Sequence, residues 1–187
     1  MVRYWQPNFF MHRTLNMEAI ARTFKPLWRS KKGFEVKDMG NHIVLFVFVK
    51  ESNANRILMG ESWSYNKHLI SLQKMDKNVS VKDLAFTKTL FWVQIHDLPL
   101  GDMNPTVACE IGSSIGSIQE GLKEWGTQDG SSFMHIKVLV DTSKPLCQGR
   151  KICSDDGKVS WIRFKYERLP NLCYWCGLLS HTTKKLV

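Results

Sequence analysis

The residues Cys173, Cys176 and His181 have the spacing of ligands in a small zinc-binding turn. Two cysteines separated by two residues can direct both sulfurs at one ion from a tight turn, and Gly177 directly after them lets the backbone fold over the metal. Structural zinc sites are nearly always four-coordinate. Leu186, which cannot bind a metal, stands five residues after His181, where a fourth ligand is expected. The sequence therefore supplies three of four ligands.

Three interpretations of the incomplete ligand set remain open. The site is degenerate and binds zinc weakly or not at all, or a further ligand completes it from Cys109, Cys147, Cys153 or residues beyond Val187. In the third interpretation, three ligands hold an open catalytic zinc with a bound water. Terminal segments tend to fray, which argues against a catalytic site at this position.

Aromatic and basic residues surround the ligands. Tyr174 and Trp175 lie between the two cysteines and are candidate stacking platforms for unpaired bases. Packing of at least one of them onto the preceding hairpin is the competing expectation. The candidate phosphate contacts are Arg163, Lys165, Arg168, Lys184 and Lys185.

The net charge of +9 is unevenly distributed along the chain. Residues 1–90 contain 15 Lys and Arg and 7 Asp and Glu. The corresponding counts are 2 and 7 in residues 91–141, and 9 and 3 in residues 142–187. A basic front and a basic tail around an acidic middle predict two surfaces for a polyanion. Individual lysines and arginines can equally serve solubility alone.

Composition excludes several protein classes. Hydrophobic residues at 43% indicate a folded chain, and neither a membrane-spanning run nor a signal peptide is present, which predicts an intracellular protein. Five cysteines fit a reducing compartment and metal binding better than a disulfide framework. His96, Asp97, His135 and Cys109 could form a nucleophile and base, but neither a nucleophile elbow nor a phosphate loop occurs. We expect no enzymatic activity.

The first half of the chain predicts alternating helices and strands. Asn16 is typical of an N-cap for a helix whose apolar face carries Ile20, Phe24, Leu27 and Trp28. The expected elements are a helix at 17–28, a hairpin of strands 34–38 and 42–50 turning at Gly40, a helix at 51–60 and a strand at 68–75. A further strand in the first few residues would complete the split β-α-β unit of ferredoxin-like folds.

Two phenylalanines in this half allow two interpretations. Phe46 and Phe48 share one face of their strand, as stacking rings do in RNA-recognition sheets, but the glycines and leading basic residue of that motif are absent. Packing in the core is the favoured interpretation.

The second half predicts another α+β unit. Asn104 and Pro105 are typical of a helix start, and Val107, Ile111 and Ile115 would form its apolar face. Strands are expected at 91–100, 116–122 and 133–141, followed by a hairpin of 149–154 and 159–166. The predicted fold class is α+β, organised as a first unit at 1–75, a linker at 76–90, a second unit at 91–170 and a partial zinc knuckle at 171–187.

Four segments together resemble a known family. Residues 91–100, 141–146, 161–170 and 173–181 resemble, in this order, plant proteins in which a domain of unknown function precedes a CCHC-type zinc knuckle, often related to retroelements. The resemblance implies zinc as cofactor and non-enzymatic binding of single-stranded RNA or DNA. Leu186 departs from the family pattern. The alternative is a protein interaction or self-association module whose knuckle is a relic.

Overall fold

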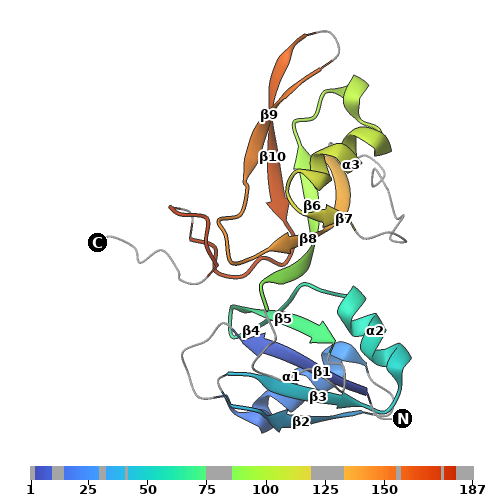
Figure 1. Ribbon diagram of the computed structural model, residues 1–187, viewed down its shortest axis with the longest axis vertical. Helices are drawn as coiled ribbons and strands as arrows, with labels where there is room; N and C mark the ends of the chain where they lie inside the picture. The colour runs from blue at the N-terminus through green and yellow to red at the C-terminus, as the bar shows by residue number, and fades with distance from the viewer. Residues whose placement is uncertain are drawn as a thin grey trace. The chain divides into compact units, whose positions relative to one another are not determined.

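The computed structural model describes residues 3–9, 15–29, 33–40, 42–74, 86–118, 133–154, 157–173 and 175–179, with only the backbone given for residues 3–9. The chain divides into two compact units, Met1–Thr87 and Lys88–Val187. Each unit combines helices with an antiparallel five-stranded sheet, which confirms the α+β class (Figure 1). Within these ranges, no helix has the length and apolar character needed to cross a bilayer.

In its described residues, unit 1 has two α-helices and one sheet with the strand order β2-β3-β1-β5-β4. The first strand lies centrally in this sheet, because β1 pairs with β3 on one side and β5 on the other, both antiparallel. The strand β4 was not predicted. The elements are β1 (Arg3–Phe9), α1 (Met17–Trp28), β2 (Phe34–Asp38), β3 (Val44–Phe48), α2 (Glu51–Met59), β4 (Trp63–Tyr65) and β5 (His68–Lys74).

The helix α1 has the predicted boundaries. The Asn16 side chain accepts a 3.0 Å hydrogen bond from the backbone N–H of Ala19, which satisfies a donor left free at the helix start. Ile20, Phe24 and Trp28 are buried, whereas Leu27 is 49% exposed. The prediction that Leu27 belongs to the apolar face was therefore wrong. The buried face is formed by positions 20, 24 and 28, which are spaced four residues apart.

The core of unit 1 settles the two interpretations of Phe46 and Phe48. Both rings are buried, at 1% and 2% exposed, in a cluster with Phe24 and Trp28 of α1. Trp28 packs edge-on against Phe46 with ring centroids 4.8 Å apart. Core packing is confirmed, and stacking of nucleic-acid bases on these two rings is excluded because α1 covers them.

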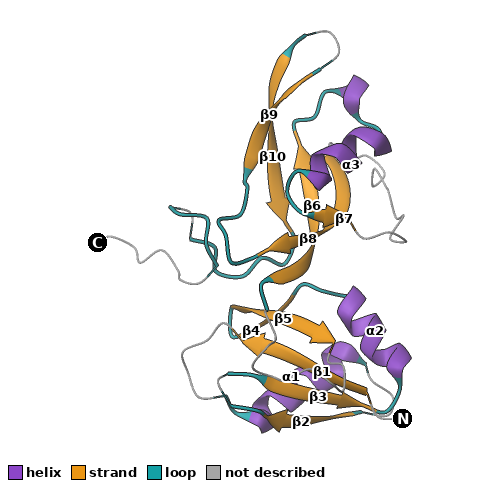
Figure 2. Ribbon diagram, in the orientation of Figure 1, coloured by secondary structure: helices purple, strands orange, loops and turns teal. Residues whose placement is uncertain are grey.

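Unit 2 has a sheet with the order β7-β8-β6-β10-β9 and one α-helix in the described residues (Figure 2). The strand β6 begins at Lys88, inside the predicted linker 76–90, while residues 75–85 lie outside the described ranges, as do 119–122 of the predicted strand 116–122. The elements are β6 (Lys88–His96), a 3₁₀ helix (Leu100–Asp102), α3 (Pro105–Ser113), β7 (Ser117–Ile118), β8 (Phe133–Asp141), β9 (Gly149–Cys153) and β10 (Val159–Tyr166).

The helix α3 packs against β7 and β8 on one face of this second sheet. Asn104 caps it by accepting a 3.0 Å hydrogen bond from the Val107 N–H, as predicted. The buried face consists of Ala108, Ile111 and Gly112. A β-carbon on Gly112 would lie 2.0 Å from Cδ1 of Ile136 in β8, so the missing side chain allows the close approach of helix and sheet. On the opposite face of the sheet, the side chains of β10 are exposed, whereas Lys137 of β8 is buried.

Substitutions in α1 test the core assignment. Phe24→Ala removes a fully buried ring and should lower the free energy of unfolding of unit 1 by about 3–5 kcal/mol. Leu27→Ala, three residues further on and half exposed, is the matched control and should change it by about 0.5 kcal/mol or less. Urea denaturation of the two variants measures the difference, and equal losses would contradict the packing described here.

Candidate nucleic-acid interface and knuckle turn

The strand β10 alternates between a buried and an exposed face. Ile162, Phe164 and Tyr166 are buried, at 0%, 7% and 6% exposed. The intervening Trp161, Arg163 and Lys165 point to the opposite, solvent-accessible side, since successive side chains of a strand alternate. Two cations and an exposed indole therefore follow one another on a single strand.

Neighbouring strands add polar side chains to this surface. Directly paired residues in an antiparallel sheet share a face. Lys151 of β9 is paired with Trp161, and His96 and Gln94 of β6 are paired with Arg163 and Lys165. We define the β10 face as Trp161, Arg163, Lys165, Lys151 and His96.

Trp161 is positioned by a glycine on the adjacent strand. The side chain is 56% exposed. A β-carbon on Gly149 would lie 3.0 Å from both Cζ2 and Nε1 of the Trp161 indole and 2.5 Å from the Ile162 carbonyl oxygen. The indole therefore lies against the backbone of Gly149, where any residue with a β-carbon would crowd it. Contact on one side and exposure on the other leave part of the ring system open for stacking.

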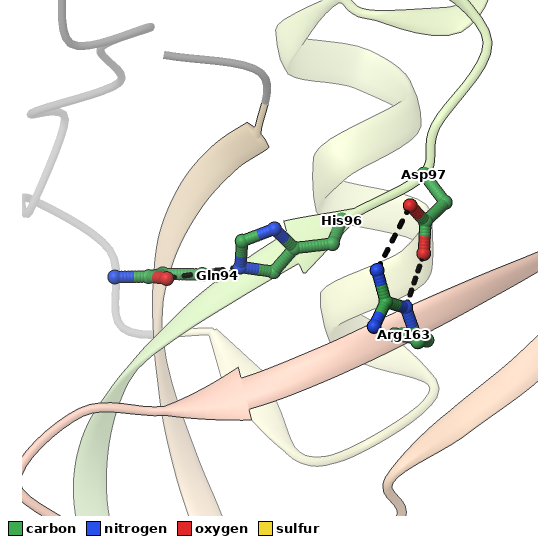
Figure 3. A network of polar contacts seen from close by, with 4 residues as sticks. All are labelled: Gln94, His96, Asp97 and Arg163. Atoms are coloured by element: carbon green, nitrogen blue, oxygen red, sulfur yellow. Dashed lines mark hydrogen bonds and ion pairs between the residues drawn. The ribbon is translucent and has the colours of Figure 1, made fainter.

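Arg163 forms a two-point ion pair with Asp97 (Figure 3). Its Nε and Nη2 donate to the two carboxylate oxygens, the second at 3.1 Å. Both side chains are largely in solvent, with 65% and 46% of their surfaces exposed. The hydrogen bond from Arg163 lowers the pKa of Asp97, and the same contact raises the pKa of Arg163.

A hydrogen-bonded chain runs from His96 to the end of β10. His96 Nε2 lies 3.0 Å from Gln94 Oε1, and Gln94 Nε2 donates to Glu167 Oε1 at 2.7 Å. Nε2 of His135 in β8 lies 2.9 Å from the same Glu167 oxygen, without the alignment of a hydrogen bond. Burial, with the charge of Arg163 beside it, lowers the pKa of His96, although the nearby Asp97 carboxylate opposes this shift.

The two cysteines lie on a closed turn. Gly177 N–H donates to the Cys173 carbonyl at 2.7 Å, and Cys173 N–H donates to the Leu178 carbonyl at 2.9 Å. Gly177 has a φ of +73°, a conformation that glycine adopts without strain. Cys173 is 3% exposed, whereas Trp175 between the cysteines is 93% exposed. The backbone therefore turns tightly at Gly177, whereas its folding over a metal ion stays a prediction.

The turn that carries Cys173, Cys176 and Gly177, called the knuckle turn below, is attached to the sheet by protein contacts. Leu146 N–H donates to the Gly177 carbonyl at 2.9 Å, and the Tyr166 hydroxyl donates to the Cys147 carbonyl at 2.8 Å. Burial raises the pKa of Tyr166, which keeps this donor protonated. The segment 145–147 therefore joins β10 on one side to the turn on the other.

The predicted site residues fall into two groups. Arg163 and Lys165 lie together on the β10 face, Arg168 follows the strand with an exposed side chain, and Trp175 projects from the turn. The expectation that one aromatic of the pair packs onto the hairpin is not met by Trp175. Tyr174, His181, Lys184 and Lys185 lie outside the described residues.

The structure does not complete the metal site from elsewhere in the fold. Across the described ranges, no three His, Cys, Asp or Glu side chains are close enough to hold one ion. A further ligand from Cys109, Cys147 or Cys153 therefore stays a prediction. Cys109 lies in α3, and the Cys153 thiol donates to the neighbouring Ser154 carbonyl.

The residues proposed above as a nucleophile and base have other partners. Asp97 binds Arg163, His96 lies against Gln94 and His135 contacts Glu167. Each of these polar side chains is thus occupied by a structural neighbour within the described part of unit 2.

Sequence reasoning missed three members of the interface. Trp161 and Lys151 were not singled out, and Asp97 was considered only as part of a possible nucleophile and base. Trp161 could have been found by extending the alternation of Arg163 and Lys165 two residues back. Lys151 required the register of the β9–β10 hairpin, and the contact of Asp97 with Arg163 spans 66 residues. No local sequence pattern predicts a contact between residues so far apart in the chain.

Two protein families match separate parts of the chain. Residues 2–83 match a domain of unknown function, DUF4283, and residues 140–186 match a zinc knuckle of the CCHC type. The chain thus contains a DUF4283 domain followed by a CCHC zinc knuckle. The knuckle match begins at the end of β8 and includes β9 and β10, so it covers most of the β10 face as well as the turn.

A plant protein is similar to much of this chain. The uncharacterized protein At4g02000 of Arabidopsis thaliana is 26% identical over 125 residues, which are 67% of this chain and 39% of that protein. The chain therefore spans about two fifths of the length of this curated relative. No solved structure matches the chain.

Glycine substitutions test how the turn is held. Gly177→Ala introduces a β-carbon at positive φ and 3.2 Å from Cβ of Pro145, so it should detach the turn and speed hydrogen exchange at the Leu146 amide. Gly157→Ala is the matched control, with a φ of +77° and open space around the new β-carbon. It carries the backbone strain alone, about 1 kcal/mol. Equal Leu146 exchange in both variants would contradict docking of the turn on segment 145–147.

Proposed function

We propose that unit 2 binds single-stranded nucleic acid, RNA foremost, through the β10 face and the exposed Trp175 of the knuckle turn. The observation that carries the proposal is the convergence of Trp161 with Arg163 and Lys165 on one exposed strand face. The zinc knuckle match supports the same class of ligand. Neither feature implies a bond-making step, so the proposed role is binding without catalysis.

The mechanism combines stacking with neutralisation of phosphates. Unpaired bases stack on exposed aromatic faces, which is tolerant of sequence because every base has a π-face. Trp161 offers such a face on the sheet and Trp175 a second one on the turn. Lys165, Lys151 and Arg163 are placed to contact the phosphates between bases, which makes binding salt-dependent.

The charge distribution favours this role over a protein interaction module. An interface for self-association would present an apolar patch with few charges at its centre. The exposed Trp161 is instead paired with Lys151 and followed by Arg163 on its own strand. Self-association remains the alternative, and an apolar surface without cations around Trp161 would have supported it.

Zinc, if bound, would be held by Cys173, Cys176 and His181. It would supply a structural cross-link between the turn and the following residues. The turn around Cys173 is already closed by its own hydrogen bonds and by the Leu146 contact. We therefore propose weak zinc binding that adds little to the position of Trp175.

Unit 1 is proposed to be a ferredoxin-like split β-α-β unit. The central place of β1 between β3 and β5, with α1 and α2 contributing to one core, supports this assignment. We also propose a retroelement-related origin, which is supported by the order of a DUF4283 domain and a zinc knuckle and by the similarity to a plant protein.

Salt-titrated binding of a labelled single-stranded RNA tests the proposed function. Trp161→Ala removes an exposed stacking surface and should weaken binding by about 1–3 kcal/mol, because one base loses its platform. Lys165→Gln should lower the slope of log K against log salt by about 0.7, the contribution of one phosphate contact on a single strand. Fluorescence anisotropy between low and moderate salt measures both quantities.

The control removes the same charge from another unit. Lys25→Gln, in α1 of unit 1, should leave affinity and salt slope close to the wild type. Trp161→Ala should unfold at the same temperature as the wild type, since the side chain is exposed. Wild-type affinity in both unit 2 variants would overturn the proposal.

Metal removal tests the role of zinc separately. Zinc should leave the purified protein on dialysis against a mild chelator, with no change in hydrogen exchange at the Leu146 amide, because protein contacts hold the turn. Cys176→Ser should lower zinc content further and serves as the control. A full equivalent that resists the chelator, together with loss of Leu146 protection when zinc is removed, would contradict weak, dispensable binding.

A further inference from the structure

The guanidinium of Arg163 is already engaged on one edge. Arginine has five N–H donors in a planar fork. Nε and Nη2 form one edge of that fork, and both donate to Asp97. This two-point geometry matches a carboxylate and a phosphate equally well. Asp97 therefore occupies the Nε–Nη2 edge of Arg163, one of the two edges on which a backbone phosphate could bind.

The position of Asp97 is set by the backbone. Asp97 follows β6 directly and has a φ of +62°, a conformation that Asp and Asn adopt more readily than other residues with a β-carbon. His96 precedes it and is paired with Arg163 across the strands. The carboxylate is thus placed at the rim of the β10 face by the end of a neighbouring strand.

The ion pair is suited to exchange. Both side chains are largely exposed, and exposed ion pairs are weak because water competes for each partner. A phosphodiester that replaces Asp97 keeps the charge of Arg163 compensated. The displaced carboxylate, however, stays near the bound phosphate and repels it, since a short side chain cannot move far.

We propose that Asp97 is an affinity-determining residue of the β10 face, an internal anion that backbone phosphates must displace from Arg163. This inference rests on the proposed function, because it assigns a competitor within the same site. It predicts that the wild-type protein binds single strands more weakly than a variant in which Asp97 does not pair with Arg163. Ligands with few phosphates are disfavoured most, since a single contact does not compensate for the loss of the pair.

A double-mutant cycle tests the competition. Asp97→Asn removes the charge and keeps a side chain that tolerates the positive φ. It should tighten binding of the labelled RNA by about 3- to 10-fold at low salt and steepen the salt slope by about 0.7, the effect of one additional phosphate contact. In the Arg163→Gln background, the same substitution should give no such gain, because the residue that Asp97 occupies is absent.

The control removes a carboxylate from the other side of the sheet. Glu110 is exposed on α3, which packs on the opposite face, so Glu110→Gln changes the net charge equally. It should leave the affinity within about twofold of the wild type, because exposed charges separated by more than a Debye length are screened. A gain equal to that of Asp97→Asn would overturn the proposal in favour of a general charge effect.

Two other outcomes also contradict the inference. Weaker binding by Asp97→Asn would mean that Asp97 supports Arg163 in its binding position instead of competing. An undiminished gain in the Arg163→Gln background would mean that Asp97 acts independently of Arg163. If the wild type and Asp97→Asn both fail to bind RNA, the proposed function is contradicted as well. If the wild type binds RNA and the binding depends on Trp161, the proposed function stands even where the role of Asp97 is contradicted.

A measurement that does not depend on binding affinity completes the test. The Nε–H resonance of Arg163 reports its partner directly in nuclear magnetic resonance spectra. It should shift in the free protein on Asp97→Asn and should shift in the wild type when RNA is added. An Nε–H resonance that RNA leaves unchanged in the wild type would show that Asp97 is not displaced and would overturn the proposal.

Discussion

The alternation of β10 is the constraint on which the arrangement of unit 2 depends. Its buried side chains, Ile162, Phe164 and Tyr166, face the core on the side covered by α3. Because the period of a strand is two, fixing these residues inside also fixes Trp161, Arg163 and Lys165 outside. A shift of one residue in register would bury two cations. The hydrophobic requirement of the core therefore determines the composition of the exposed face.

The knuckle turn depends on the same strand. Tyr166, the last buried residue of β10, holds the Cys147 carbonyl, and the adjacent Leu146 holds Gly177 of the turn. In an isolated zinc finger, metal binding supplies much of the folding free energy. Here the turn has a second anchor in the sheet, which fits the extent of the zinc knuckle match from residue 140 onward. The position of Trp175 would then not depend on a metal ligand at position 186.

The sequence predicted those elements whose signals are local. The starts of α1 and α3 follow from Asn16 and Asn104 as caps, and β8 and β10 follow from their alternation. The end of α3 was not predicted, since the helix ends at Ser113, before the expected apolar position Ile115. The central position of β1 and the short strand β4 were not predictable in the same way, because they depend on pairing between distant segments. The same distinction applies to the site. Arg163 and Lys165 were found by composition, whereas their neighbours Lys151 and Asp97 required strand register and a contact across the sheet.

The central claim is that single-stranded nucleic acid binds on the β10 face of unit 2, beside the knuckle turn. Titration of unlabelled single-stranded RNA into isotopically labelled protein, followed by nuclear magnetic resonance, tests it most directly. The account predicts shifts for the Trp161 indole N–H, the Arg163 Nε–H and backbone amides of β10, with α3 unaffected. Shifts concentrated on α3, or an absence of shifts at Trp161 and Arg163 under conditions where RNA binds, would contradict it.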